Sequence, residues 1–283
     1  MSSGQKVIKI LAIIFAIIII VNIFGALIFG TSILLGISKF NDTEVNNHEE
    51  TIKIDDNVND NMHFSETYQN VESIDIDINL SNLIIKQGEE LKVEAFNVPN
   101  SFSSKVIGNE LKIKEKGNKN LFSDYEMAKI IVYIPQNLTF RKVNVETDVG
   151  SILIEQIKAN EFDIDSGVGT ITLKNVESNR TDINTGSGEA NIESSKLNNL
   201  EFDAGLGKVN IEAEITGISK IDAGVGEINI KLLGNKEDYR INTETGIGSI
   251  TIDNKKYSNN ASFGNGINTI RVSGGIGNVK VAF

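Results

Sequence analysis

Six oxygen-bearing side chains recur at one position of a repeated phrase, and they are the residues best suited to chemistry in this chain. Each lies four residues before the second glycine of a Gly-x-Gly motif, at Glu146, Asp165, Asn184, Asp203, Asp222 and Glu244. Calcium prefers clustered oxygen ligands, which makes Asp165, Asp203 and Asp222 the candidate metal ligands. The chain lacks the Gly-Gly-x-Gly-x-Asp repeat of calcium-binding β-helices, and Asp or Asn beside a glycine corner also bonds the turn backbone. We therefore expect a role in turns, with no metal and no cofactor.

The sequence offers little for catalysis. It has no cysteine, and its two histidines, His48 and His63, both precede the repeats. Ser/His and Cys/His chemistry is therefore excluded within the repeats, and no residue is assigned a catalytic role. The Gly-x-Gly motifs join strand to strand and open no helix, so they are not nucleotide-binding loops. We expect a protein that is not an enzyme, with a glycan-cleaving enzyme of the cell envelope as the remote alternative.

The glycines that accompany the acidic column set the period of the chain. The second glycines at 150, 169, 188, 207 and 226 are 19 residues apart, and the next, at 248, follows after 22. A fixed period of this size indicates a solenoid. Glycine adopts positive φ at little cost, so we assign corner roles to Gly150, Gly167, Gly169, Gly186, Gly188, Gly205, Gly207, Gly224, Gly226, Gly246 and Gly248.

Strands flank each glycine pair. After the second glycine, apolar residues alternate with polar ones, as at Ile152/Ile154 and Val209/Ile211, and a shorter alternating run precedes the pair. This period of two indicates half-buried strands. The residue after the second glycine is Glu189, Lys208 and Glu227 in successive repeats, so stacking of equivalent residues would place the lysine between two glutamates. The expected fold is an all-β parallel β-solenoid in which each coil covers its neighbours.

The N-terminal region predicts a membrane anchor. Residues 10–37 are apolar and uncharged, which is enough to span a bilayer. Lys6 and Lys9 precede this run, so the positive-inside rule predicts a cytoplasmic N-terminus at 1–9 and an exported body. The run is longer than a signal-peptide core and no clear cleavage site follows; we expect a single-pass, uncleaved signal anchor in the cell membrane, with cleavage as the alternative.

The rest of the chain divides into a linker and one β-domain. Residues 38–70 are polar and acidic, as in a flexible linker, and 71–283 carry the strands. Alternating runs, a Gly108-Asn109 hairpin and a strand that ends at Pro135 come before the regular repeats at 143–252. The out-of-register Gly275-Ile276-Gly277 predicts that 253–283 form a shortened closing cap, as terminal repeats do.

Charge narrows the choice of partner. The chain has a formal net charge of −11, and every one of its 38 acidic residues follows residue 40. A polyanion such as nucleic acid would be repelled, so we expect no nucleic-acid partner. The sequence leaves the ligand and the oligomeric state open.

The order of these elements resembles a known bacterial family. An alternating strand at Val71–Leu80, the hairpin from Gly108 to Ile113, the strand from Val132 to Pro135 and the Gly-x-Gly coils are similar to the toastrack domain of unknown function, also called the "putative adhesin" domain. The resemblance covers about 71–283 and implies a right-handed parallel β-helix. An N-terminal anchor before such a domain is similar to LiaG-type proteins of envelope-stress systems. The family implies no catalytic residues.

Two functions follow as expectations. The first is a non-enzymatic accessory or interaction component of the bacterial cell envelope, with its C-terminal domain outside the membrane and a membrane or envelope protein as its partner. The alternative is an adhesin-like module that binds a wall polymer or surface protein.

Overall fold

Strands account for almost all of the structure in the computed structural model, which describes residues 62–116 and 127–283. One short 3-10 helix, η1 (Lys236–Asp238), is the exception among these residues. The strands are β1 (Met62–Tyr68), β2 (Ser73–Gly88), β3 (Leu91–Val98), β4 (Ser103–Ile107), β5 (Glu110–Glu115), β6 (Ala128–Pro135), β7 (Phe140–Ile154), β8 (Ile157–Lys174), β9 (Val176–Asn198), β10 (Leu200–Thr216), β11 (Ile218–Leu232), β12 (Tyr239–Ile252), β13 (Lys255–Tyr257), β14 (Asn260–Phe263) and β15 (Asn268–Ala282).

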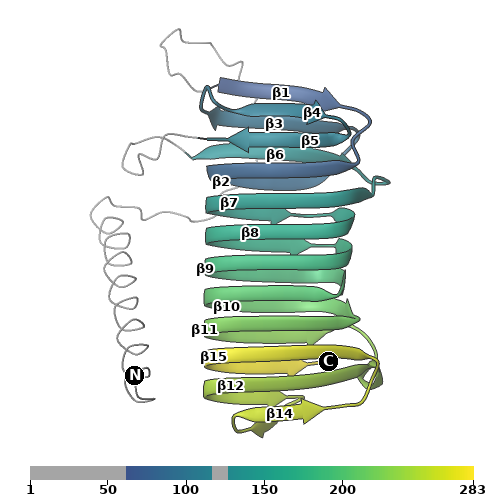
Figure 1. Ribbon diagram of the computed structural model, residues 1–283, viewed down its shortest axis with the longest axis vertical. Coiled ribbons are helices and arrows are strands. Elements are labelled where there is room, and N and C mark those ends of the chain that lie inside the picture. Colours follow the sequence, from purple (N-terminus) through teal and green to yellow (C-terminus); the bar gives the residue numbers. More distant parts are fainter. Residues whose placement is uncertain (1–61, 117–126) are drawn as a thin grey trace, which may run out of the picture. The chain divides into compact units, whose positions relative to one another are not determined.

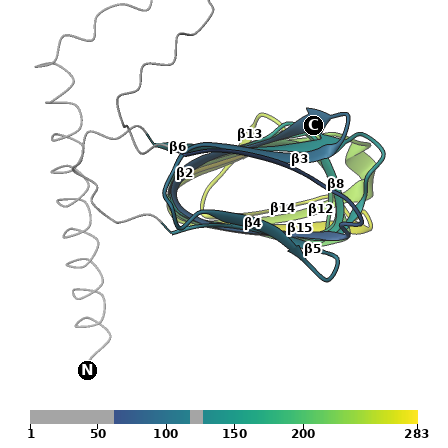
Figure 2. The same ribbon diagram turned by 90° about the horizontal axis from the view of Figure 1, so that it is seen from above.

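Each long strand is one coil that bends between two layers. In β2, Ser73–Ile78 pairs with β5, whereas Ser81–Gly88 pairs with β6. Figure 2 shows the two layers from above, with β4 and β5 in one and β3 and β6 in the other. We call these the first and second layer, because the first half of every coil lies with β4 and β5.

The coils stack in parallel and in register, which confirms the predicted all-β solenoid. Within β7 to β11, residues 19 apart are partners, except after a shift at Glu212/Ala213 in β10, so Gly150 lies beside Gly169 and Gly207 beside Gly226. Lys208 lies between Glu189 and Glu227, as the spacing predicts. Figure 1 shows the coils following one another along the long axis of the stack. The right-handed sense of the coil stays a prediction.

Alternation along each coil builds the core. Phe162 and Ile164 of the first layer, and Ile171 and Leu173 of the second, are almost fully buried between the layers. A third apolar column, made of Ile157, Val176, Leu197 and Ile215, is buried too. The buried side chains of adjacent coils pack against one another between the two layers, so no coil has a core of its own.

The second glycines stand where no other residue fits. Their φ angles lie between +143° and +156°, a region that is essentially restricted to glycine. A Cβ at Gly207 would lie 1.7 Å from the carbonyl oxygen of Gly188 in the preceding coil. The first glycines are also tight, since a Cβ at Gly186 would lie 2.5 Å from the oxygen of Gly167.

The first coil turns its corner without glycine. In β2 the corner is Asn79-Leu80-Ser81. The strand that lies beside the first half of β2 in the stack is β5, which ends at Glu115. The carboxylate of Glu115 is buried, and its Oε2 accepts hydrogen bonds from Asn79 N at 2.9 Å, Leu80 N at 3.1 Å and Ser81 Oγ at 3.0 Å. The acid therefore replaces the backbone acceptors that a preceding coil would supply.

The C-terminal strand differs from the predicted closing cap. β15 lies between β11 and β12, where Gly277 pairs with both Gly226 and Gly248 (Figure 1). Residues 268–282 are thus an internal coil, in register with the others, and the last coil is β12. Between β11 and β12 the chain skips the width of one strand, and β15 later fills this space. The skip accounts for the longer step to Gly248.

Antiparallel strands close both ends of the stack. β13 and β14 pair with the two halves of β12 at one end, while β4 and the antiparallel pair β1 and β3 close the other. Short antiparallel strands of this kind are a common way to limit edge-to-edge association.

The N-terminal boundary of the β-domain also differs from the expectation. The predicted linker runs to residue 70, but Met62–Tyr68 forms β1, which pairs with β3. The alternation in this segment is too short and polar to distinguish it from a linker. The predicted span at 10–37 lies outside the described residues, and within 62–116 and 127–283 the structure contains no helix long and apolar enough to cross a membrane.

Candidate functional site: an acidic face of stacked carboxylates

The predicted acidic column exists as a row across the first layer. Strand pairing places Glu146 beside Asp165, then Asn184, Asp203 and Asp222 in successive coils. The side chains point outward, because the residues on either side of each one point into the core or the corner. The structure adds Asp77 before Glu146 and inserts Ser273 of β15 between Asp222 and Glu244.

A second polar row runs beside the first, and the sequence analysis missed it. It lies two residues earlier in each coil, and its members are Asp75, Asn144, Asp163, Asp182, Glu201, Lys220, Arg271 and Asn242. The same period of 19 and the alternation of the strand could have revealed it. We call the two rows together the acidic face.

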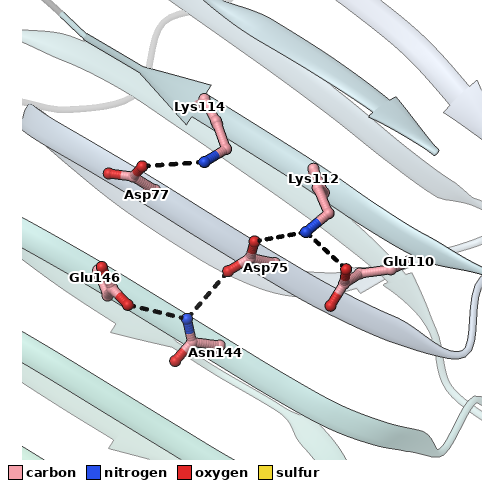
Figure 3. A network of polar contacts seen from close by, with 7 residues as sticks. All are labelled: Asp75, Asp77, Glu110, Lys112, Lys114, Asn144 and Glu146. Atoms are coloured by element: carbon pink, nitrogen blue, oxygen red, sulfur yellow. Dashed lines mark hydrogen bonds and ion pairs between the residues drawn. The ribbon is translucent and has the colours of Figure 1, made fainter. Parts of the chain in front are cut away.

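At its N-terminal end the acidic face is neutralised by lysines of β5. Lys112 Nζ lies 3.2 Å from Asp75 and 2.8 Å from Glu110, and Lys114 Nζ lies 3.3 Å from Asp77 (Figure 3). Asn144 links the next coil by donating to Asp75 at 3.0 Å and to Glu146 at 3.3 Å. Burial alone would raise the pKa of Asp75, but the bonds from Asn144 and Lys112 outweigh it and hold that pKa below its usual value.

A lysine lies between two of the candidate metal ligands. Lys220 Nζ is 2.6 Å from Asp222 and 3.7 Å from Asp203. The hydrogen bond to Asp222 is the main reason that the pKa of Lys220 is raised. The ammonium thus occupies the place where a shared cation would lie. Asp165 lies two coils from Asp203, separated from it by Asn184.

The described residues therefore do not assemble the predicted ligands into a metal site. No group of three or more His, Cys, Asp or Glu side chains within 62–116 and 127–283 is arranged to hold a metal ion. A shallow hollow of about 600 Å³ lies over the end of the acidic face, lined by residues that include Asp203, Asp222, Glu244, Asn260 and Ser273. Its carboxylates can attract a basic group, but they do not enclose one.

The outer surface of the second layer is different in charge. Lys174 pairs with Glu193 at 3.3 Å and Lys231 with Glu212 at 3.0 Å, each across neighbouring coils. Beside these pairs, Asn191, Asn210 and Asn229 form a ladder in which each later amide donates to the one before, at 2.7 and 3.1 Å. A hollow of about 550 Å³ lies over this charge-balanced face.

The site residues offer no catalytic constellation. His63, the one histidine among the described residues, is exposed on β1, and its ring centroid lies 4.7 Å from that of Phe96. His48 lies outside the described residues. The two outer faces are built to present side chains at a fixed spacing of about 4.8 Å between coils.

Fold and site together define a β-solenoid with two outer faces of contrasting charge. The chain belongs to the Toastrack DUF4097 family, whose model matches residues 40–282. The expected family is thereby confirmed, together with the all-β solenoid fold. No curated protein matches the chain.

Several solved structures are similar to this chain at low sequence identity. A "putative cell adhesion protein" from Clostridium sporogenes shares 16% identity over 78% of this chain and 99% of its own, with a TM-score of 0.36. A "putative adhesin" from Parabacteroides merdae shares 15% identity over 79% and 96%, with a TM-score of 0.45. A "putative lipid binding protein" from Parabacteroides distasonis shares 13% identity over 78% and 96%, with a TM-score of 0.46.

Proposed function

We propose that this protein is a non-enzymatic interaction component of the bacterial cell envelope, held by residues 10–37 and displaying its β-solenoid outside the membrane. The acidic face is the observation that carries the proposal. Its carboxylates lie in register on a rigid stack, and a surface of this kind attracts a basic partner over several coils at once. An envelope-stress system is the setting that the anchor and the domain together favour.

The charge-balanced face supports a second function, that of an adhesin-like module. A ladder of amides beside a hollow of about 550 Å³ repeats at the spacing of the coils. Amides both donate and accept hydrogen bonds, so this row suits a hydroxyl-rich polymer such as a wall glycan.

Crosslinking in living cells distinguishes the two functions. We expect the full chain to capture discrete membrane or envelope proteins, and a chain that lacks residues 1–40 to lose them. Capture of wall material by both forms would instead favour the adhesin-like module.

Charge reversal then locates the contact. Asp165→Lys with Glu201→Lys alters the acidic face, and Glu193→Lys with Glu212→Lys is the matched control on the other face. Loss of partner capture in the first pair alone is the expected result. Equal capture by both pairs would contradict a role for the acidic face.

A further inference from the structure

An aliphatic ridge follows the corner of the stack. The residue between the two corner positions is Val149, Val168, Leu206, Val225, Ile276 and Ile247 in successive coils, with Ser187 between Val168 and Leu206. Val168 is 52% exposed and Ile247 is 66% exposed, and the others are partly exposed. We call these six aliphatic residues the apolar ridge.

The residues directly before and after each ridge residue carry almost no side chains. Glycine lies on both sides of it in almost every coil, because a Cβ there would meet the carbonyl oxygen of the preceding coil at 1.5 to 2.7 Å. The exception is Asp148 before Val149. The corner therefore presents a straight, convex row of branched side chains, about 29 Å long at the usual strand spacing.

The core does not account for this row. The ridge residues point away from both layers, and the corner itself needs only the glycines. Exposed aliphatic residues are ordinary when scattered, but an apolar row that only Ser187 interrupts is of the kind that marks an interaction site. Eight coils keep this position, since β2 places Leu80 beside Val149, and seven of the eight carry Val, Leu or Ile.

The shape of the ridge favours lipid over protein as its occupant. Two convex ridges of this length touch along a line, which buries far less than the roughly 1,000 Å² that a specific interface needs. A glycan would find no hydrogen-bonding groups on the ridge. Lipid adapts to a convex edge, and each exposed aliphatic side chain that leaves water stabilises the contact.

Chain length keeps the ridge close to lipid if the anchor is as proposed. The 24 residues at 38–61 separate the predicted span from β1, and a chain of that length reaches at most about 80 Å. Tethering of this kind raises the effective concentration of a weak second contact.

We propose that the apolar ridge is a membrane-contacting edge, which lays the solenoid lengthwise on the outer surface of the bilayer that holds its anchor. This inference rests on the proposed anchoring. It leaves the acidic and the charge-balanced face directed away from the lipid on either side of the ridge, where both can bind partners. The acidic face disfavours an anionic surface, as do Glu189 and Glu227 beside the ridge, whose charge Lys208 between them neutralises only in part. The contact is therefore stronger on zwitterionic lipid.

The absence of native cysteine allows a direct test with single spin labels. The full chain is reconstituted into phosphatidylcholine vesicles with a nitroxide at Val168→Cys or Val225→Cys, and at Lys196→Cys as an exposed control away from the corner. Collision with oxygen, which concentrates in lipid, is compared with collision with a water-soluble nickel complex. We expect oxygen to dominate at both ridge positions and nickel to dominate at the control, with the ridge preference weakened when phosphatidylglycerol is added.

Every other outcome overturns the inference. Nickel access at the ridge equal to that at the control would place the ridge in water. Exclusion of both agents would show a protein occupant, and spin–spin broadening would identify it as a second copy. Failure of the chain to float with vesicles would remove the anchor itself. Partner capture in cells is measured separately, so the proposed function can stand when the ridge contact fails.

A serine variant provides the matched comparison. Val168→Ser, Leu206→Ser and Val225→Ser together should abolish the oxygen preference of a label at Ile276→Cys. Ile107→Ser removes an aliphatic side chain that is 51% exposed away from the ridge, and it should leave that preference unchanged. Circular dichroism confirms that both variants keep the fold.

Discussion

Alanine at Gly207 should destabilise the stack far more than positive φ alone explains. The new Cβ would lie 1.7 Å from the oxygen of Gly188, whereas ordinary contact begins at 3.4 Å. Relief requires the two coils to separate by more than about 1 Å, which takes several N–H···O distances out of hydrogen-bonding range. Two or three lost bonds at about 1 kcal/mol each, with a backbone penalty of about 1–2 kcal/mol, give a loss of about 3–5 kcal/mol.

Alanine at two further glycines separates the cost of the steric clash from the cost of the positive φ. At Gly108, φ is +63° and nothing lies within 4 Å of an added Cβ, so Gly108→Ala should cost about 1 kcal/mol for the left-handed backbone alone. At Gly186, φ is not in the restricted region and the Cβ contact is 2.5 Å, so an intermediate loss is expected. Urea unfolding of a fragment covering 58–283, followed by circular dichroism, ranks the three. A Gly207→Ala midpoint no lower than that of Gly108→Ala would refute the reasoning.

Four other changes test the rest of the structure. Glu115→Gln should cost about 1.5–3 kcal/mol in urea unfolding, because a charged acceptor of three hydrogen bonds becomes neutral; no change would contradict its role at the first corner. Thr181 is fully buried and its hydroxyl lacks a partner among the described residues, so Thr181→Val should raise stability by about 1 kcal/mol, whereas Thr243→Val, which removes a bond to a backbone oxygen, should not. Burial raises the pKa of Tyr68 to about 12, so the neutral phenol stabilises the fold below pH 10 and this contribution is lost between about pH 10 and 12; Tyr68→Phe should flatten that loss, and an unchanged pH profile would argue against it. A chain that ends at Ile267 lacks β15, so hydrogen exchange should accelerate in β12 and β14 and leave β7 to β9 protected; uniform protection would contradict the interposed position of β15.

The sequence predicted the fold best at the corners, where each glycine packs against the corresponding glycine of the preceding coil. A Cβ at Gly169 meets Gly150, and a Cβ at Gly188 meets Gly169, so one steric rule fixes both the residue type and the period. The first corner differs, since the carboxylate of Glu115 accepts from the backbone of Asn79 and Leu80 there and the corner carries no glycine. Without a glycine pair, β2 looks like two separate strands in the sequence.

The position of β15 follows from spatial order, which period counting along the chain does not reveal. Gly277 lies between Gly226 and Gly248 in space but after both in sequence. The only hint in the sequence was the 22-residue spacing between Gly226 and Gly248. In the structure this spacing reflects a gap between β11 and β12 that β15 fills later. A three-residue insertion in a loop would produce the same spacing, so the sequence does not distinguish the two.

The candidate site was predictable in outline only. The spacing of Asp165, Asp203 and Asp222 gives their row, but Lys220 enters between two of them from a neighbouring row. Pairing across rows depends on which coil lies beside which, and on the rotamers of long side chains. The apolar ridge needed the structure as well, because an alternating pattern does not show that the corner residue points outward.

Labelling of intact cells tests the central claim most directly, which is that the solenoid is displayed outside a membrane that holds the chain. Ser258→Cys places one thiol on the exposed connection between β13 and β14. A membrane-impermeant maleimide should label it before lysis, and the labelled chain should stay in the membrane pellet after carbonate extraction. Labelling only after lysis, or release of the chain from the pellet, would contradict the account.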